Sequence, residues 1–252
     1  MPLCFALACL AGPTVASDGA AKPDVVAFNA TVRVDVDASG KPVKVEAPAD
    51  LPESIRAFIE KRVASWQYAP ARQNGVPVSA VTFVMVGACA MPAAEGYRLG
   101  LDFKGNGPAV VDPGPWFMRP PQYPGEAQRG GAEGSFQVSY SIRPDGTTTL
   151  GSIVPIETNT GSRHARVFKQ AIASWIEAQR FQPEQVNGVA VATEVSFPVD
   201  FELRDGGRPG EYREELEARA LASKECIAAS APSGLLPIAT NSPVKVTPVP
   251  AG

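Results

Sequence analysis

A motif that occurs twice limits the folds that this sequence can adopt. The stretch SWQYAPARQNGVPV occupies residues 65–78, and EAQRFQPEQVNGVAV occupies residues 177–191. Aligned on the Asn-Gly pair, the matched residues are Tyr68 with Phe181, Pro70 with Pro183, Asn74 with Asn187 and Gly75 with Gly188. The proline prevents a preceding helix from continuing, and Asn-Gly supplies the positive φ angles of a tight turn into a strand. We therefore expect the chain to build the same passage from helix to strand twice.

The residues around the two motifs repeat as well. ATVRVDVDASG (30–40) and FQVSYSIRPDG (136–146) alternate apolar and polar residues and end in a glycine turn, as half-buried strands do. Between strand and Asn-Gly turn, residues recur every three or four positions, which predicts a helix with one stripe against a sheet. The predicted stripes are Ile55, Ile59, Val63 and Trp66 after Pro52 in the first copy, and Phe168, Ile172, Trp175 and Gln179 in the second. After the second Asn-Gly, one face of a long strand carries Val191, Val195, Phe197, Val199, Phe201 and Leu203.

Each copy thus reads as strand, turn, short strand, helix, aromatic-x-proline bend, Asn-Gly turn and long strand. The predicted fold class is α+β, with two units that are each an antiparallel three-stranded sheet with a helix packed on one face. The predicted boundaries are a signal peptide at 1–16, a first unit at 24–92, a linker at 93–114, a second unit at 115–204, and a helical, Pro-rich tail at 205–252. Within the tail, residues 210–226 are expected to form a solvent-facing helix, and the final SPVKVTPVPAG is expected to be mobile.

The second copy carries a longer set of matching residues. In chain order these are Tyr123, Pro124, Ala127, Gly134, Asp145, Gly146, Phe181 and Pro183. This combination resembles the C-terminal domain of the TonB energy-transducer family. The first copy lacks the Tyr-Pro opening and matches only from Ala30 to about Val86, so it resembles a degenerate member of the same fold.

The resemblance implies a periplasmic protein-binding module whose partners are outer-membrane receptors of the TonB-dependent type. A short receptor segment adds as a strand to the edge of the family's sheet. Pro198 has no amide hydrogen, so the strand over 191–203 is expected at an edge or at a bulge, where it can accept an extended peptide. The expected docking edge is Val191, Ala192, Thr193, Glu194, Val195, Ser196 and Phe197, with Gln122, Tyr123 and Pro124 as a second contact implied by the resemblance.

An alternative leaves that edge capped by the chain's own tail or by the first copy. The protein would then be a structural or self-associating scaffold of the cell envelope. The transmembrane helix and the long Pro-rich spacer of full transducers are not recognisable in these 252 residues. Force transmission from the inner membrane is therefore not part of the expected role.

Composition and the N-terminal residues indicate a compartment. A net charge of -3 gives no basic face for nucleic acid or anionic lipid. An apolar stretch followed by small residues up to Ala16 predicts a signal peptide, and no segment is expected to span a membrane; lipid attachment at Cys9 is an alternative. After cleavage, Cys89 and Cys226 remain as a disulfide candidate, or as two separate buried thiols.

The sequence offers few groups that could act together in catalysis. His164 is the only histidine, so a metal site or a catalytic triad would depend on that one residue. Cys89 ends an apolar stretch without a basic residue beside it, and no phosphate-binding glycine loop is present. We therefore expect that the protein is not an enzyme and that it binds no cofactor and no metal.

Overall fold

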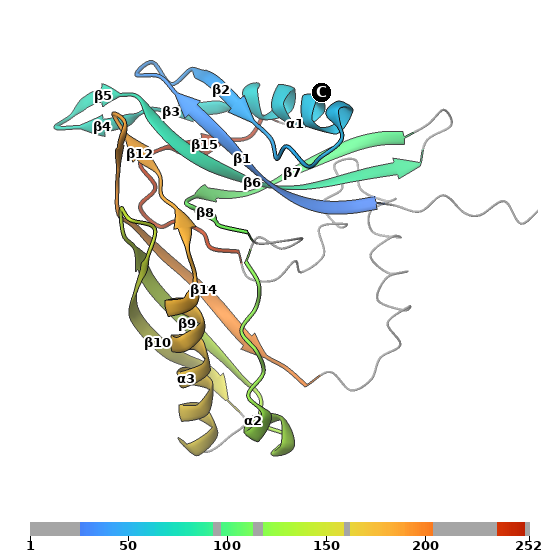
Figure 1. The fold of residues 1–252 in the computed structure, drawn as a ribbon, viewed down its shortest axis with the longest axis vertical. Helices are drawn as coiled ribbons and strands as arrows, with labels where there is room; N and C mark the ends of the chain where they lie inside the picture. The colour runs from blue at the N-terminus through green and yellow to red at the C-terminus, as the bar shows by residue number, and fades with distance from the viewer. Residues whose placement is uncertain (1–25, 93–96, 113–117, 159–161, 204–235, 250–252) are drawn as a thin grey trace, which may run out of the picture.

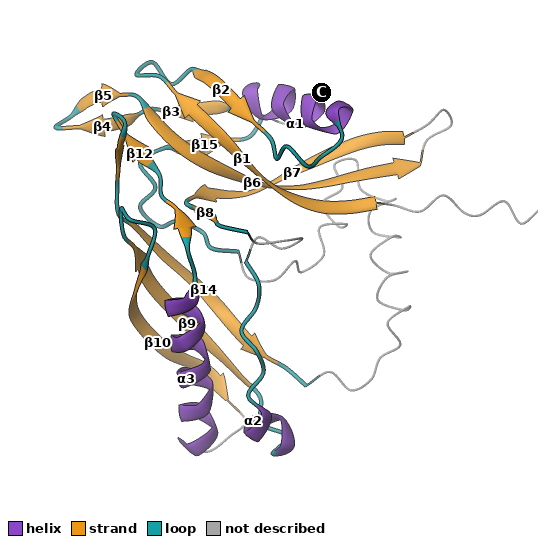
Figure 2. Cartoon of the chain, in the orientation of Figure 1, coloured by secondary structure: helices purple, strands orange, loops and turns teal. Residues whose placement is uncertain are grey.

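The computed structural model describes residues 26–92, 97–112, 118–158, 162–203 and 236–249. They form a mixed α+β structure made mostly of strands, and every strand pairing among them is antiparallel. Two main sheets lie in different parts of the molecule, and each is accompanied by a helix (Figures 1 and 2). The predicted α+β class is confirmed.

The first sheet has six strands. In sheet order they are β13 (Val189–Ala190), β12 (Gln185–Val186), β6 (Ala80–Pro92), β1 (Val26–Val36) and β2 (Pro42–Glu46), and β7 (Tyr97–Gly107) also pairs with β6. Helix α1 (Glu53–Ala64) follows β2 in the chain. β12 pairs with β6 at Ala80 and Val81, and β7 pairs with it from Phe83 to Pro92, both on the side away from β1.

The second sheet has three strands in the order β10 (Thr148–Thr158), β9 (Gly134–Ile142) and β14 (Thr193–Phe201). Helix α3 (Ser162–Ala178) packs against β10 and β9, and the short helix α2 (Gly125–Arg129) contacts α3. This sheet matches the predicted three strands and one helix. The first sheet is larger than the predicted three strands.

Short strands complete the structure. They are β3 (Gln67–Ala69), β4 (Ala71–Gln73), β5 (Val76–Val78), β8 (Ala109–Val110), β11 (Phe181–Gln182) and β15 (Lys245–Thr247), which pair as β4 with β5, β8 with β11 and β15 with β3. Both Asn-Gly pairs have the expected positive φ angles, at 50° for Asn74 and 52° for Asn187.

The alternating residues of the central strands form the two cores. Val32, Val34 and Val36 are buried together with Ile59 and Val63 of α1. The second core contains the β9 residues Phe136, Val138, Tyr140 and Ile142, the β14 residues Val195, Phe197, Val199 and Phe201, and the α3 residues Phe168, Ile172 and Ile176. The buried stripe of α3 thus ends on Ile176, four residues after Ile172, whereas the predicted Trp175 lies beside it and is half-buried.

Two segments in which no strand is predicted contain ordered strands. The linker predicted at 93–114 includes β7, in which Leu101 is buried and Phe103 packs edge-to-face on Trp66 with ring centroids 5.4 Å apart. Glycines break its hydrophobic pattern, but its backbone ladder with β6 continues on both sides of a register shift between Phe103 and Gly105. The final segment, predicted to be mobile, contains β15 and the fully buried Val244. The helix predicted at 210–226 and the signal peptide at 1–16 lie outside the described residues.

Candidate partner-binding site

A groove of about 520 Å³ lies beside the Tyr-Pro pair of the second sheet. Its lining residues are Pro120, Gln122, Tyr123, Pro124, Gly125, Ala171, Ser174 and Trp175. The chain before α2 supplies one wall and the exposed side of α3 supplies the other. The groove therefore contains all three residues that the resemblance implies as a second contact.

The two aromatic residues of the groove are held by the sheet beneath it. The Tyr123 ring packs edge-to-face on Phe201 at 5.5 Å, and its hydroxyl donates to the carbonyl of Ala132. The Trp175 ring packs edge-to-face on Phe197 at 6.1 Å, and its Nε1 donates to the Arg119 carbonyl over 2.8 Å. Both ring positions are thus fixed against side chains of β14. A groove with two aromatic rings and a few polar groups suits a proline-containing or apolar peptide.

The predicted docking residues 191–197 have several different environments. Val191 donates its amide to the Glu184 carbonyl over 3.0 Å, and Thr193, Val195 and Phe197 are buried. Ala192 and Glu194 are exposed, and Ser196 is half-buried. Of this set, Phe197 contacts a groove residue, Trp175. The two predicted contact sets are thus connected through β14 but do not form one cluster.

The direction of the β14 backbone groups follows from its regular ladder with β9. Both backbone groups of Glu194 are bonded to residues outside the sheet, so they point away from β9. In an antiparallel ladder this direction alternates, so Ser196, Pro198 and Asp200 also point outward. Pro198 therefore supplies only a carbonyl at the edge, as a proline on an edge strand should.

The outward edge of β14 is partly occupied by the chain's own C-terminal segment. Thr240 donates its amide to the Glu194 carbonyl over 2.8 Å, and the Glu194 amide donates to Oδ1 of Asn241 over 2.7 Å. Val195 and Ala239 form an isolated antiparallel bridge. Among the described residues no strand pairs with β14 beyond this point. The docking edge predicted at 191–197 is therefore not open at Glu194 and Val195, because residues 239–241 already satisfy it.

A buried carboxylate joins the two sheets and the C-terminal segment. Glu184 is fully buried between β11 and β12, and its carboxylate accepts hydrogen bonds from Thr82, Thr193 and Ser242 over 2.6, 3.3 and 2.7 Å. Burial raises the pKa of Glu184 above its ordinary value, while these hydrogen bonds and the positive charge of Lys245 act in the opposite direction. Removing any one donor would leave this carboxylate poorly compensated.

Comparison with known families decides what the second sheet is. Residues 119–203 match the family model described as Gram-negative bacterial TonB protein C-terminal. These residues form a TonB C-terminal domain. The match begins just before the Tyr-Pro groove and ends just after β14, so it contains both predicted contact sets. Comparison of the chain with curated proteins gave no match.

Membership of residues 119–203 in this family implies a periplasmic location and interaction with other proteins. No helix of the described residues is long and apolar enough to cross a membrane. Among the same residues, no group of three or more His, Cys, Asp or Glu side chains is placed to hold a metal ion. Cys89 is disulfide-bonded, whereas Cys226 lies outside the described residues, so their pairing stays a prediction.

Three features of the TonB C-terminal domain and its surroundings were missed from the sequence. Trp175 packs against the core through Phe197 but also lines the groove, and its neighbour Ile176 is the fully buried residue of the helix stripe. Glu184 stands where the first copy has Ala71, a difference visible in the alignment of the two motifs. Residues 239–241 carry no local pattern that identifies their place on β14.

Proposed function

We propose that this protein is a periplasmic binding protein for extended segments of TonB-dependent outer-membrane receptors, and that it catalyses no reaction itself. The observation that carries the proposal is the family match over residues 119–203, which spans the aromatic groove and the edge strand β14. A receptor segment would add its backbone to the outward groups of β14 and place side chains near the groove. A signal peptide ending at Ala16 would deliver the protein to that compartment.

We also propose that residues 24–92 are a degenerate copy of the same domain. The two sheets share a strand order, β2-β1-β6 in one and β10-β9-β14 in the other, which supports this relationship. Along the chain, α1 lies between β2 and β6, and α3 lies between β10 and β14. A Cβ atom built on Gly40 would lie 2.3 Å from the Tyr68 carbonyl oxygen, and one on Gly146 would lie 2.1 Å from that of Phe181. In both copies, the backbone carbonyl of the motif aromatic thus lies against a turn glycine.

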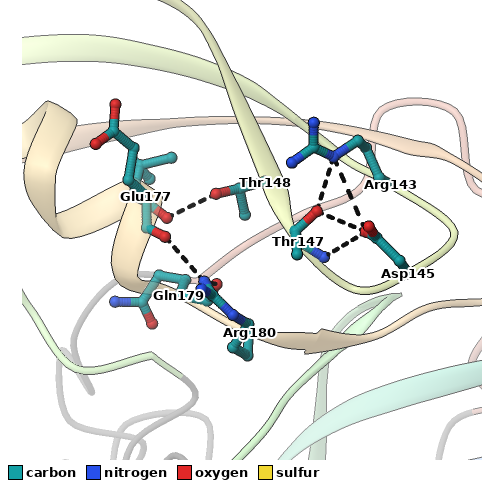
Figure 3. Close-up of polar contacts among 8 residues, drawn as sticks. Arg143, Asp145, Thr147, Thr148, Glu177, Gln179 and Arg180 are labelled. Carbon is teal, nitrogen blue, oxygen red and sulfur yellow. Dashed lines mark hydrogen bonds and ion pairs between the residues drawn. The ribbon is translucent and has the colours of Figure 1, made fainter.

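A backbone carbonyl near the end of the helix in each copy also supports the relationship between the two copies. The Val63 carbonyl, five residues before Tyr68, accepts the Tyr68 hydroxyl over 2.8 Å. The Ile176 carbonyl, five residues before Phe181, accepts the Thr148 hydroxyl over 2.8 Å. Thr148 and its turn are labelled in Figure 3. The Arg143–Thr147 turn holds Thr148 in place, since Asp145 accepts the Thr147 amide over 2.9 Å. Equivalent backbone positions are therefore satisfied by different side chains.

Peptide binding tests the receptor proposal. Peptides from the N-terminal segments of TonB-dependent receptors, labelled with fluorescein, would be titrated with the full chain and followed by fluorescence anisotropy. Ser196→Pro removes an outward amide from β14, so we expect it to weaken binding about fivefold, the effect of one hydrogen bond. Ser196→Ala keeps the amide and should bind as the unmodified chain does. Equal affinity of the proline and alanine variants would reject pairing at this edge.

The groove is tested separately. Gln122→Ala changes an exposed groove residue and should weaken the same peptides, whereas Gln128→Ala on the exposed side of α2 should not. A loss shared by both variants would show that the effect is not specific to the groove.

A structural scaffold is the second candidate, and the closed start of the β14 edge favours it. The other edge strand of the domain is β10, and it contains Pro155. The backbone groups of the preceding residue, Val154, point toward β9, so the nitrogen of Pro155 points away from β9. Both edges thus contain a proline that discourages open-ended pairing. A self-associating scaffold predicts a stable dimer in light scattering together with no affinity for receptor peptides.

A further inference from the structure

The C-terminal segment runs from the TonB C-terminal domain to the first sheet. We call residues 236–249 the strap. Its first part lies on the edge of β14, Ser242 reaches the buried carboxylate of Glu184, and Lys245–Thr247 pairs with Gln67–Ala69 of β3. In Figure 1 the strap is drawn in red and passes between the two sheets. One continuous segment therefore contacts the binding domain and an anchor outside it.

The two parts of the strap are held very differently. Val244 is fully buried, and Ser242 donates to Glu184 while it accepts from Nδ2 of Asn106 over 2.9 Å. Thr240 and Asn241 are exposed, and Ile238 is 44% exposed. Exposed segments with few buried contacts open at lower free energy than the cores they lie on. Residues 238–241 can thus detach from β14 while Ser242 and Val244 stay anchored.

The first sheet provides the space that the strap needs near β14. A Cβ atom on Gly107, the last residue of β7, would lie 2.8 Å from the Cβ of Ala239. A Cβ atom on Gly105 would lie no closer than 3.6 Å to the side chains of Ile238 and Met85. A glycine at 107 therefore permits the close passage of Ala239 that brings it opposite Val195.

The strap occupies the same backbone groups that an added peptide strand would use. Both hydrogen-bonding groups of Glu194 are engaged by Thr240 and Asn241, and Pro198 offers no amide further along the edge. A peptide that pairs along β14 from Glu194 to Asp200 must therefore replace the strap at its first position. The apparent affinity of such a peptide equals its affinity for the open edge multiplied by the fraction of molecules in which the strap is open.

We propose that the strap is an autoinhibitory contact, in which residues 238–241 close the outward edge of β14 and an extended peptide binds only after they detach. This inference rests on the proposed function, because the excluded ligand is the extended segment proposed above. Glu184 and Ser242 act as the anchor that keeps the detached segment close to β14. Binding is thereby made conditional on local opening, without unfolding of either sheet.

Thr240→Pro in the full chain tests the proposal, with Thr240→Ala as its matched control. Both substitutions remove the Thr240 hydroxyl, which donates to the Glu194 carbonyl over 3.2 Å, but only proline also removes the amide that bonds this carbonyl over 2.8 Å. Opening is measured as hydrogen exchange of the Glu194 amide by NMR. Binding is measured with the receptor peptide and with a second probe, a labelled peptide of the strap sequence LPIATNSPV (236–244). We expect Thr240→Pro to speed exchange and to raise the affinity for both peptides about fivefold, and Thr240→Ala, which loses only the hydroxyl bond, to change both quantities less.

Other outcomes separate this inference from the proposed function. Faster exchange in Thr240→Pro with unchanged affinity for the receptor peptide overturns autoinhibition and leaves the proposed function standing. Binding of the strap peptide alone supports closure of the edge and overturns receptor binding. Unchanged exchange at Glu194, or no binding of either peptide to a variant with faster exchange, overturns the inference. Should Thr240→Pro fold poorly, Gly107→Ala displaces Ala239, and Gly105→Ala controls for backbone strain because both glycines have a positive φ.

Discussion

β6 and β14 occupy the same place in their two sheets, but their outer edges are closed in different ways. β7 pairs with β6 from Phe83 to Pro92, and β12 continues the coverage at Ala80 and Val81. Within the part of the chain that the structure describes, the outer edge of β14 is covered by a single bridge at Val195 and by three hydrogen bonds of Glu194. A long ladder opens only with its sheet, whereas a short exposed contact opens locally. The difference explains why a binding role is proposed for the second edge only.

The two motifs differ most at the residue after the proline. Ala71 is fully buried in the apolar core of the first sheet, whereas Glu184 is fully buried among three hydroxyl donors. A buried carboxylate is tolerated only when hydrogen bonds compensate for its lost hydration. The same backbone position therefore serves packing in one sheet and a connection between sheets in the other.

Substitutions at these two positions should give the largest effect. Ala71→Glu places a carboxylate in a mainly apolar core, and we expect it to lower the free energy of unfolding by about 4 kcal/mol or more. Glu184→Gln keeps an acceptor for Thr82 and Ser242 and should cost about 1 kcal/mol. Urea denaturation measures both values. Equal losses would contradict the assignment of different roles to the two positions.

Substitution of the two turn glycines should give the next largest effect. Gly40→Ala and Gly146→Ala each force a Cβ against a motif carbonyl, and each glycine has a positive φ. We expect losses of about 3 kcal/mol for both. Gly188→Ala has a positive φ but no atom within 4 Å, so it should lose about 1 to 2 kcal/mol. A loss at Gly146 that greatly exceeds the loss at Gly40 would weaken the case for two related copies.

Local patterns predicted the strands with alternating apolar residues, together with their buried faces. The alternation at Val32, Val34 and Val36 describes one strand, and its period of two depends only on neighbouring residues. The family of the second sheet was also predictable, because its matching residues lie within 119–203. Helix faces were less certain, since Trp175 and Ile176 are adjacent and only packing decides which one faces the sheet.

Contacts between distant segments could not be predicted in the same way. The pairings of β12 with β6 and of β15 with β3 join segments that are far apart in the sequence, and neither has a periodic signal of its own. The glycines of β7 hid a strand whose stability comes from its ladder with β6. Because the strap contacts are also of this kind, the state of the β14 edge was left open by the sequence.

The buried carboxylate that distinguishes the second motif should make stability depend on pH. Burial raises the pKa of Glu184 above its ordinary value of 4.5, so the folded state binds more protons than the unfolded state between those two pKa values. The free energy of unfolding should therefore fall as pH rises through this window, and should gain nothing further below 4.5. The measurement is the difference between the unmodified chain and Glu184→Gln in urea denaturation across this pH range. A difference that grows in favour of the unmodified chain as pH rises would contradict the burial effect.

The smallest effect concerns the carbonyl that ends each helix. Tyr68→Phe leaves the buried Val63 carbonyl without its hydroxyl partner, and Thr148→Val does the same to the Ile176 carbonyl. Each should cost about 1 to 2 kcal/mol, measured by urea denaturation.

If the two positions are equivalent, Phe181→Tyr should recover most of the loss in a Thr148→Val background, because its hydroxyl would reach the carbonyl five residues earlier, as Tyr68 does. In the unmodified chain the same substitution should give no gain, since Thr148 already occupies that carbonyl. Recovery in both backgrounds, or in neither, would mean that the two helix ends differ in geometry, and the relationship between the sheets would then rest on strand order alone.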